Sequence, residues 1–127
     1  MIVVDWGDAD DALIVWRFEG PWTPKDYYIA LERVSRLVAA KQHRVNVMVD
    51  VSQAALPRNA MALANKGFQA RPANLGLIVV ITDHTLWHML YEMITRMSGI
   101  DYGLKFVNTI DEAYLLLGEA ADEEART

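Results

Sequence analysis

The stretch Leu75–Thr82, LGLIVVIT, decides the fold of this chain. Its last five residues, from Ile78 to Thr82, are all β-branched, and such residues favour an extended strand. Because the run is apolar at successive positions, both faces of the strand need to be covered. This pattern is typical of an inner strand in a sheet that is flanked by helices, and it predicts an α/β fold.

Upstream of this strand, the sequence predicts a hairpin, a helix and a further strand. Apolar residues alternate over 2–6 and over 14–18, with a turn-rich stretch between them. Thr23 is placed to cap a helix that begins at Pro24 and runs to about residue 40, with Asp26 in its first turn. VNVMVDV, residues 45–51, predicts the next strand. A loop over 56–59 then leads into a second helix through residue 70.

Downstream, the pattern predicts a helix over 84–97, a short strand over 104–107 and a last helix. Thr109 and Glu112 have the spacing of a capping box, and Gly118 is expected to end that helix. The predicted order is ββαβαβαβα around a mixed central sheet of about five strands. We expect one domain over 1–118, followed by an acidic tail over 119–127.

Composition narrows the class of protein further. Hydrophobic residues make up 53% of the 127 residues against 23% charged, which is typical of a packed globular domain. No cysteine occurs, so disulfides, thiolate metal sites and cysteine nucleophiles are excluded. The beginning of the chain has no signal-peptide pattern, and the longest apolar run, 77–81, is too short to span a membrane. We therefore expect a cytoplasmic protein.

The net charge of −5 argues against nucleic acid as a partner. Much of that charge lies at the C-terminus, where residues 119–127 contain four acidic residues and one arginine. We interpret this segment as a solvated, frayed end, because terminal charged segments usually have nothing to pack against.

With its elements in this order, the chain resembles the STAS domain, the fold of bacterial anti-sigma-factor antagonists and of the cytoplasmic domains of sulphate transporters. The resemblance covers residues 12–118. It depends on FEGPWT at the turn into the first helix, VMVDVS on the middle strand, LGLIVVIT on the next strand, and MSGI followed by DEAYLLL. It implies a regulatory module that binds other proteins and has no catalytic residues.

One departure from the family concerns its phosphorylation switch. In the antagonists, a serine or threonine preceded by aspartate begins the helix after the middle strand and is phosphorylated by a partner kinase. Here that position falls near Arg58, Asn59 and Ala60, which carry no hydroxyl group. The switch is therefore not expected in this chain, and pairing with an anti-sigma kinase becomes doubtful.

Candidate metal and catalytic residues have simpler interpretations. His84, His88 and Glu92 stand at helical spacing, but they fall at or within the polar sector of the helix, so we interpret them as a solvated face. The acidic residues at 8, 10 and 11 lack the glycine and distal glutamate of a calcium loop and are expected to form a turn. No serine lies in a hydrolase motif, and no glycine-rich phosphate loop occurs. No enzyme activity, metal or cofactor is predicted.

Two features indicate binding. Asp50 and Ser52 end the middle strand, at the edge of the sheet where α/β proteins commonly bind ligands, although the favoured interpretation is that they bond turn amides as the chain leaves the strand. The helix over 84–97 has an apolar arc of about 200°, wider than one sheet face requires. Neighbouring helices could cover the surplus, or it could form a partner groove or an apolar ligand pocket, because methionine repacks readily.

We therefore predict a non-catalytic interaction module of bacterial signalling that binds a protein partner or self-associates as a homodimer. The alternative is a binding protein for a small apolar or lipid-like ligand, held between the methionine-rich helix and the sheet. The predicted partner-binding residues are Asp50, Ser52, Leu56, Arg58, Asn59, Met89 and Met93.

Overall fold

The computed structural model describes residues 1–54, 72–83, 88–89, 92, 96 and 104–126. Its strands and helices, in chain order, are β1 (Ile2–Trp6), β2 (Leu13–Gly20), α1 (Pro24–Ala39), β3 (Val45–Ala54), β4 (Leu75–Ile81), β5 (Leu104–Val107) and α4 (Ile110–Arg126). The predicted helix through residue 70 and most of the predicted helix over 84–97 lie outside the described residues, although His88 and Met89 are helical.

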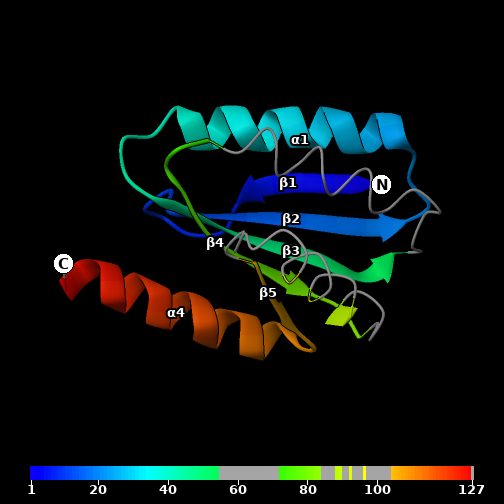
Figure 1. Ribbon diagram of the computed structural model, residues 1–127. Helices are drawn as coiled ribbons and strands as arrows, with labels where there is room; N and C mark the ends of the chain where they lie inside the picture. Colours follow the sequence, from blue (N-terminus) through cyan, green and yellow to red (C-terminus); the bar gives the residue numbers. More distant parts are fainter. Residues whose placement is uncertain (55–71, 84–87, 90–91, 93–95, 97–103, 127) are drawn as a thin grey trace.

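The five strands form one mixed sheet in the order β1-β2-β3-β4-β5. β1 and β2 form an antiparallel hairpin, and the pairs from β2 to β5 are parallel. In Figure 1, α1 lies beside the β1 end of the sheet and α4 beside the β5 end. The predicted α/β class and mixed five-stranded sheet are confirmed, and β4 is an inner strand as its β-branched run predicts.

α1 begins at Pro24, as predicted, because Thr23 and Asp26 each accept a hydrogen bond from the other's backbone amide. The Thr23 hydroxyl accepts a hydrogen bond from the Asp26 amide, and the Asp26 carboxylate accepts one from the Thr23 amide. The buried face of the helix packs on one side of the sheet. That core contains Ile14, Trp16 and Phe18 of β2, and fully burying an apolar side chain of this size contributes about 1.5 to 3 kcal/mol.

α4 builds a second core on the opposite face of the sheet. Ala113 and Leu117 are buried against Met48, Val79 and Ile81. Strand side chains alternate between the two faces, so β3 and β4 contribute to both cores. The helix begins after Thr109, whose hydroxyl accepts a hydrogen bond from the Glu112 amide, as the sequence predicts.

The prediction that Gly118 ends the last helix is wrong, since α4 continues to Arg126. The described residues include one glycine with positive φ, Gly20 at +62°, so Gly118 does not adopt the left-handed geometry of a C-terminal cap. Alanine and glutamate follow Gly118 and are strong helix formers, which favours continuation. Residues 119–126 of the expected frayed tail therefore belong to an ordered helix.

Candidate functional site: the carboxyl edge of the sheet

β2, β3, β4 and β5 run parallel, so their carboxyl ends meet at one edge of the sheet, which we call the carboxyl edge. Asp50 and Ser52 lie there on β3. One oxygen of Asp50, Oδ1, accepts hydrogen bonds from the Ser52 amide at 3.0 Å and from the Ser52 hydroxyl at 2.6 Å. Asp50 bonds a nearby amide, as the simpler interpretation predicts, but it does so inside the strand, because β3 continues to Ala54. The ligand role remains a prediction.

The pairing between β2 and β3 is irregular next to Asp50. Arg17 of β2 pairs with Asp50, but Glu19 pairs with Gln53, so β3 has one extra residue between the two pairs. This is the geometry of a β-bulge, which re-aims side chains and is frequent next to binding sites. Ser52 is exposed within the bulge. Arg17 lies next to Asp50 across the ladder and forms an exposed ion pair with Glu19 at 3.9 Å.

The other predicted partner-binding residues divide into two groups. Met89 is described, and 62% of its surface is exposed. Leu56, Arg58, Asn59 and Met93 lie outside the described residues. The structure therefore places Asp50 and Ser52 together, leaves Met89 accessible, and makes no statement about the four others.

The predicted solvated face around His88 is more enclosed than expected. His88 is partly buried, and its ring centroid lies 5.0 Å from that of Phe106 on β5. His84 lies outside the described residues, so the predicted grouping with Glu92 stays a prediction. Among the side chains that are described, no three histidine, aspartate or glutamate residues come together as metal ligands.

An aromatic cluster adjoins the carboxyl edge, beneath the first turn of α1. Trp16 stacks on Phe18 at 5.3 Å and on Tyr27 at 5.6 Å, and Trp22 contacts both Phe18 and Tyr27. Burial, together with the nearby Tyr28, raises the pKa of Tyr27 from 10.0 to about 12. The indole Nε1 atoms of Trp16 and Trp22 are buried without a hydrogen-bond partner. Nothing in the sequence indicates this cluster, because its members come from β2, α1 and the loop between them.

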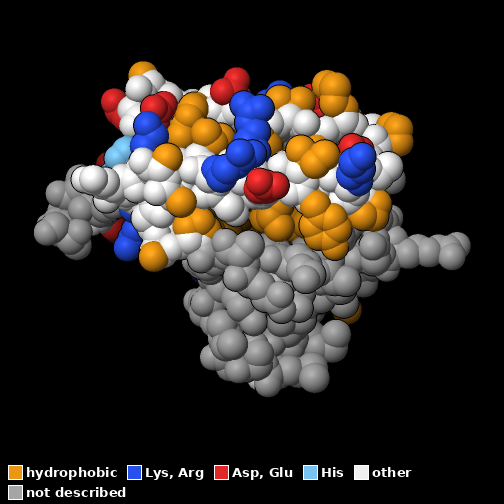
Figure 2. Space-filling model, turned by 90° about the horizontal axis from the view of Figure 1, so that it is seen from above, with side chains coloured by type: hydrophobic (Ala, Val, Ile, Leu, Met, Phe, Trp, Pro, Cys, Tyr) orange, Lys and Arg blue, Asp and Glu red, His pale blue; other side chains and the backbone are white. Residues whose placement is uncertain are grey.

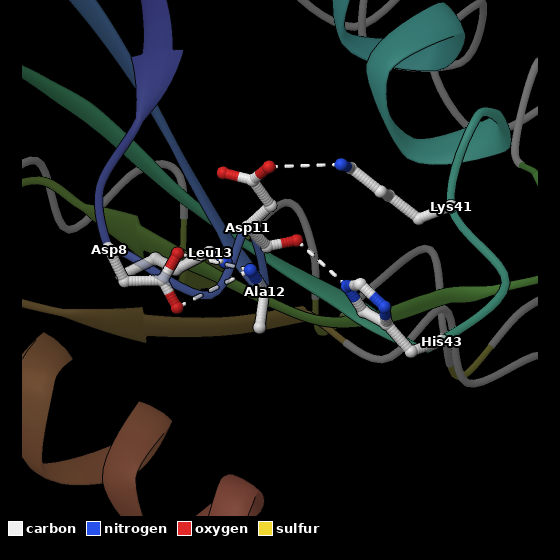
Figure 3. Close-up of polar contacts among 6 residues, drawn as sticks. All are labelled: Asp8, Asp11, Ala12, Leu13, Lys41 and His43. Atoms are coloured by element: carbon white, nitrogen blue, oxygen red, sulfur yellow. Dashed lines mark hydrogen bonds and ion pairs between the residues drawn. The ribbon is translucent and has the colours of Figure 1, made fainter.

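The opposite end of the strands, which we call the amino edge, is held by contacts between distant loops (Figure 3). The Asp8 carboxylate accepts hydrogen bonds from the Ala12 and Leu13 amides, so the acidic stretch forms a turn as predicted. Lys41 Nζ lies 2.9 Å from the Asp11 carboxylate. His43 Nε2 donates to the Asp11 carbonyl at 2.9 Å.

These contacts hold Asp11 in an unusual backbone conformation. Its φ is +54°, in the left-handed region that aspartate tolerates better than most residues. Lys41 also lies over the Trp6 ring, 5.3 Å from the centroid, so it joins the hairpin turn to the loop after α1. Nothing in the sequence indicates this arrangement, because the ion pair joins residues 30 positions apart.

Two asparagines complete the amino edge. The side-chain amide of Asn74 donates to the carbonyls of Val38, Lys41 and His43, at 2.7, 3.2 and 3.0 Å. Asn46 is buried, and its side-chain oxygen accepts from the Leu77 amide at 2.9 Å. These bonds join segments that are far apart in the chain, so they help to fix the amino edge.

Comparison with known proteins adds no relative. No family model matches the chain, and the searches of curated proteins and of solved structures also return no match. Within the described part of the chain, no helix has both the length and the apolar character needed to cross a membrane. The class that the fold defines is an α/β protein with a five-stranded mixed sheet, and the STAS resemblance stays a prediction.

Proposed function

We propose that this chain is a non-catalytic, STAS-like interaction module of bacterial signalling that acts in the cytoplasm. Its binding surface combines the carboxyl edge, around Asp50 and Ser52, with the exposed side of the helix that carries Met89. The order of a hairpin, α1, three further parallel strands and a final helix supports the proposal, because it agrees with the order expected of a STAS domain.

The observation that carries the proposal is the exposure of Met89. A large apolar side chain with 62% of its surface exposed gains free energy when a partner covers it, and methionine adapts to surfaces of varied shape. Ser52, exposed in the bulge of β3, offers a polar group at the edge of the same sheet. A partner protein or a second copy of the chain would cover both.

Met89→Glu tests this function. The substitution is expected to weaken association while lowering the free energy of unfolding by less than about 1 kcal/mol, because exposed positions tolerate charge. Sedimentation velocity and native mass spectrometry measure association, and urea unfolding measures stability. Ile29→Glu on α1 is the matched control, since Ile29 is 59% exposed on another surface. Unfolding by several kcal/mol with association intact would assign Met89 to the core and remove the proposal's main support.

The module is proposed to act without a phosphorylation switch, because residues 58–60 carry no hydroxyl group. Incubation with an anti-sigma kinase is therefore expected to leave the mass of the chain unchanged. A phosphate on Ser52 would overturn this point and restore an antagonist-like mechanism.

The unpaired indole groups favour a second candidate function, the binding of a small apolar molecule. Indole nitrogen can only donate a hydrogen bond, and a buried donor without an acceptor carries a free-energy cost. An apolar molecule with a carbonyl or carboxylate oxygen would remove that cost at Trp16 or Trp22. Native mass spectrometry would then detect a retained small molecule that is lost in Trp16→Phe, whereas the interaction module would show a dimer or a partner protein.

A further inference from the structure

α4 has an exposed apolar surface that the sheet does not cover. Ile110, Tyr114 and Leu115 are 42%, 48% and 64% exposed, whereas Ala113 and Leu117 of the same helix are buried against the sheet. At 100° per residue, Ile110, Tyr114 and Gly118 form one row, and Leu115 lies next to Gly118, three residues before it in the helix. A Cβ atom at Gly118 would meet no atom within 4 Å, so the row is open at this position. We call Ile110, Tyr114, Leu115, Gly118, Glu119 and Asp122 the outer α4 surface.

The charge on this helix is entirely of one sign until its last residue. Every charged residue from Asp111 to Glu124 is acidic, and Arg126 is the first basic residue. Glu119, Asp122 and Glu123 are exposed and take part in none of the ion pairs formed by the described residues. The surface around α1 is different, because apolar, basic and acidic side chains are mixed there (Figure 2).

Glu119, Asp122 and Glu123 lie in the C-terminal half of α4, where negative charge lowers the stability of the helix. The C-terminus of a helix carries partial negative charge, so acidic residues near it are unfavourable and basic ones are favourable. Figure 1 shows that the C-terminal turns of α4 extend past the ends of the strands, where the sheet offers little packing. A basic partner would offset both the helix dipole and the mutual repulsion of these carboxylates.

We propose that the outer α4 surface docks a basic amphipathic helix of another protein. Its apolar side chains would cover Tyr114 and Leu115, and its lysine or arginine side chains would pair with Glu119 and Asp122. A second copy of the chain does not fit this role through its own α4, because two acidic helices repel each other. This surface is separate from Met89 and the carboxyl edge, so the inference does not depend on the function proposed there.

The test uses the full chain and a synthetic helical peptide made of leucine and lysine, with binding followed by fluorescence anisotropy. The peptide is expected to bind, with an affinity that falls as salt rises. Leu115→Ala and Asp122→Lys are each expected to weaken binding about tenfold, as substitutions of central interface residues commonly do. Both positions are exposed, so circular dichroism is expected to show an unchanged fold for the two variants.

Matched controls on α1 make the result specific. Ile29→Ala removes an equally exposed apolar side chain, and Glu32→Lys makes a comparable charge change at another exposed helical position. Both controls are expected to bind the peptide within about twofold of the native chain. Equal losses in the α1 and α4 variants would reveal general charge attraction and overturn the proposal. Absence of binding would overturn it too, as would a dimer of the native chain that Leu115→Ala dissolves.

Discussion

The two ends of the parallel strands are built in different ways. At the amino edge, side chains from distant segments hold one another, as when Lys41 pairs with Asp11 or Asn74 bonds to three carbonyl groups. At the carboxyl edge, the side-chain bonds of Asp50 and Ser52 stay within three residues of chain. Bonds between distant segments fix loops relative to each other, whereas local bonds shape only the stretch of chain that contains them. The side-chain bonds of the amino edge are therefore expected to contribute more stability than those of Asp50 and Ser52, and Ser52 stays exposed at the carboxyl edge.

Of the substitutions at the amino edge, Gly76→Ala is expected to lower the free energy of unfolding most. A Cβ atom there would overlap the Asn46 side-chain oxygen and lie 2.7 Å from Arg44 Cγ. Asn46 is buried and bonded to the Leu77 amide, so it cannot move aside without losing that bond. We expect the free energy of unfolding, measured in urea, to fall by about 3 kcal/mol.

Gly118→Ala on α4 is the matched control. An added Cβ at Gly118 meets no atom within 4 Å, and alanine is the better helix former. The free energy of unfolding of this variant is expected to rise by about 0.5 to 1 kcal/mol. Similar losses at both glycines would show that the crowding at Gly76 is not what the amino edge depends on.

Ionisation of Tyr27, in the aromatic cluster next to the carboxyl edge, is expected to lower the free energy of unfolding by nearly as much as Gly76→Ala does. Its pKa is about 12 in the folded chain against an ordinary value of 10.0, so the folded state disfavours the phenolate. The contribution of neutral Tyr27 to the free energy of unfolding is fully present below pH 10, and it is lost as the pH rises from 10 to 12. Two pKa units correspond to about 2 to 3 kcal/mol.

Urea unfolding of the native chain and of Tyr27→Phe, at several alkaline pH values, measures this loss. Tyr27→Phe removes the titrating group but keeps the ring against Trp16 and Trp22. Its stability is expected to fall less than that of the native chain between pH 10 and pH 12. Parallel curves would mean that the Tyr27 hydroxyl titrates normally and that the cluster is open to water.

The parts of the fold that local sequence determines were predictable. The cap of α1 depends on Thr23 and Asp26, three residues apart, and the inner position of β4 follows from its β-branched run. The end of α4 was not predictable from Gly118, because a glycine ends a helix only where the chain turns left-handed, and this depends on the packing beyond it.

The candidate site was predictable only in part, for a related reason. The bond between Asp50 and the Ser52 amide is local, and the sequence indicated that Asp50 bonds a nearby amide, although not that it does so inside a strand. The contacts of Asn74 reach back 31 to 36 positions, and nothing near Asn74 in the sequence indicates them. The sequence also contains no signal that distinguishes an asparagine bonded to three carbonyls from one in an ordinary turn.

Urea unfolding of two variants tests the central contrast between the edges most directly. Asn74→Ala removes three hydrogen bonds between distant segments and is expected to cost about 2 kcal/mol. The double variant Asp50→Ala/Ser52→Ala removes only bonds between residues two positions apart in β3, and it is expected to lower the free energy of unfolding by less than about 1 kcal/mol. A larger loss in the double variant than in Asn74→Ala would contradict the account, because the carboxyl edge would then be the end that holds the fold together.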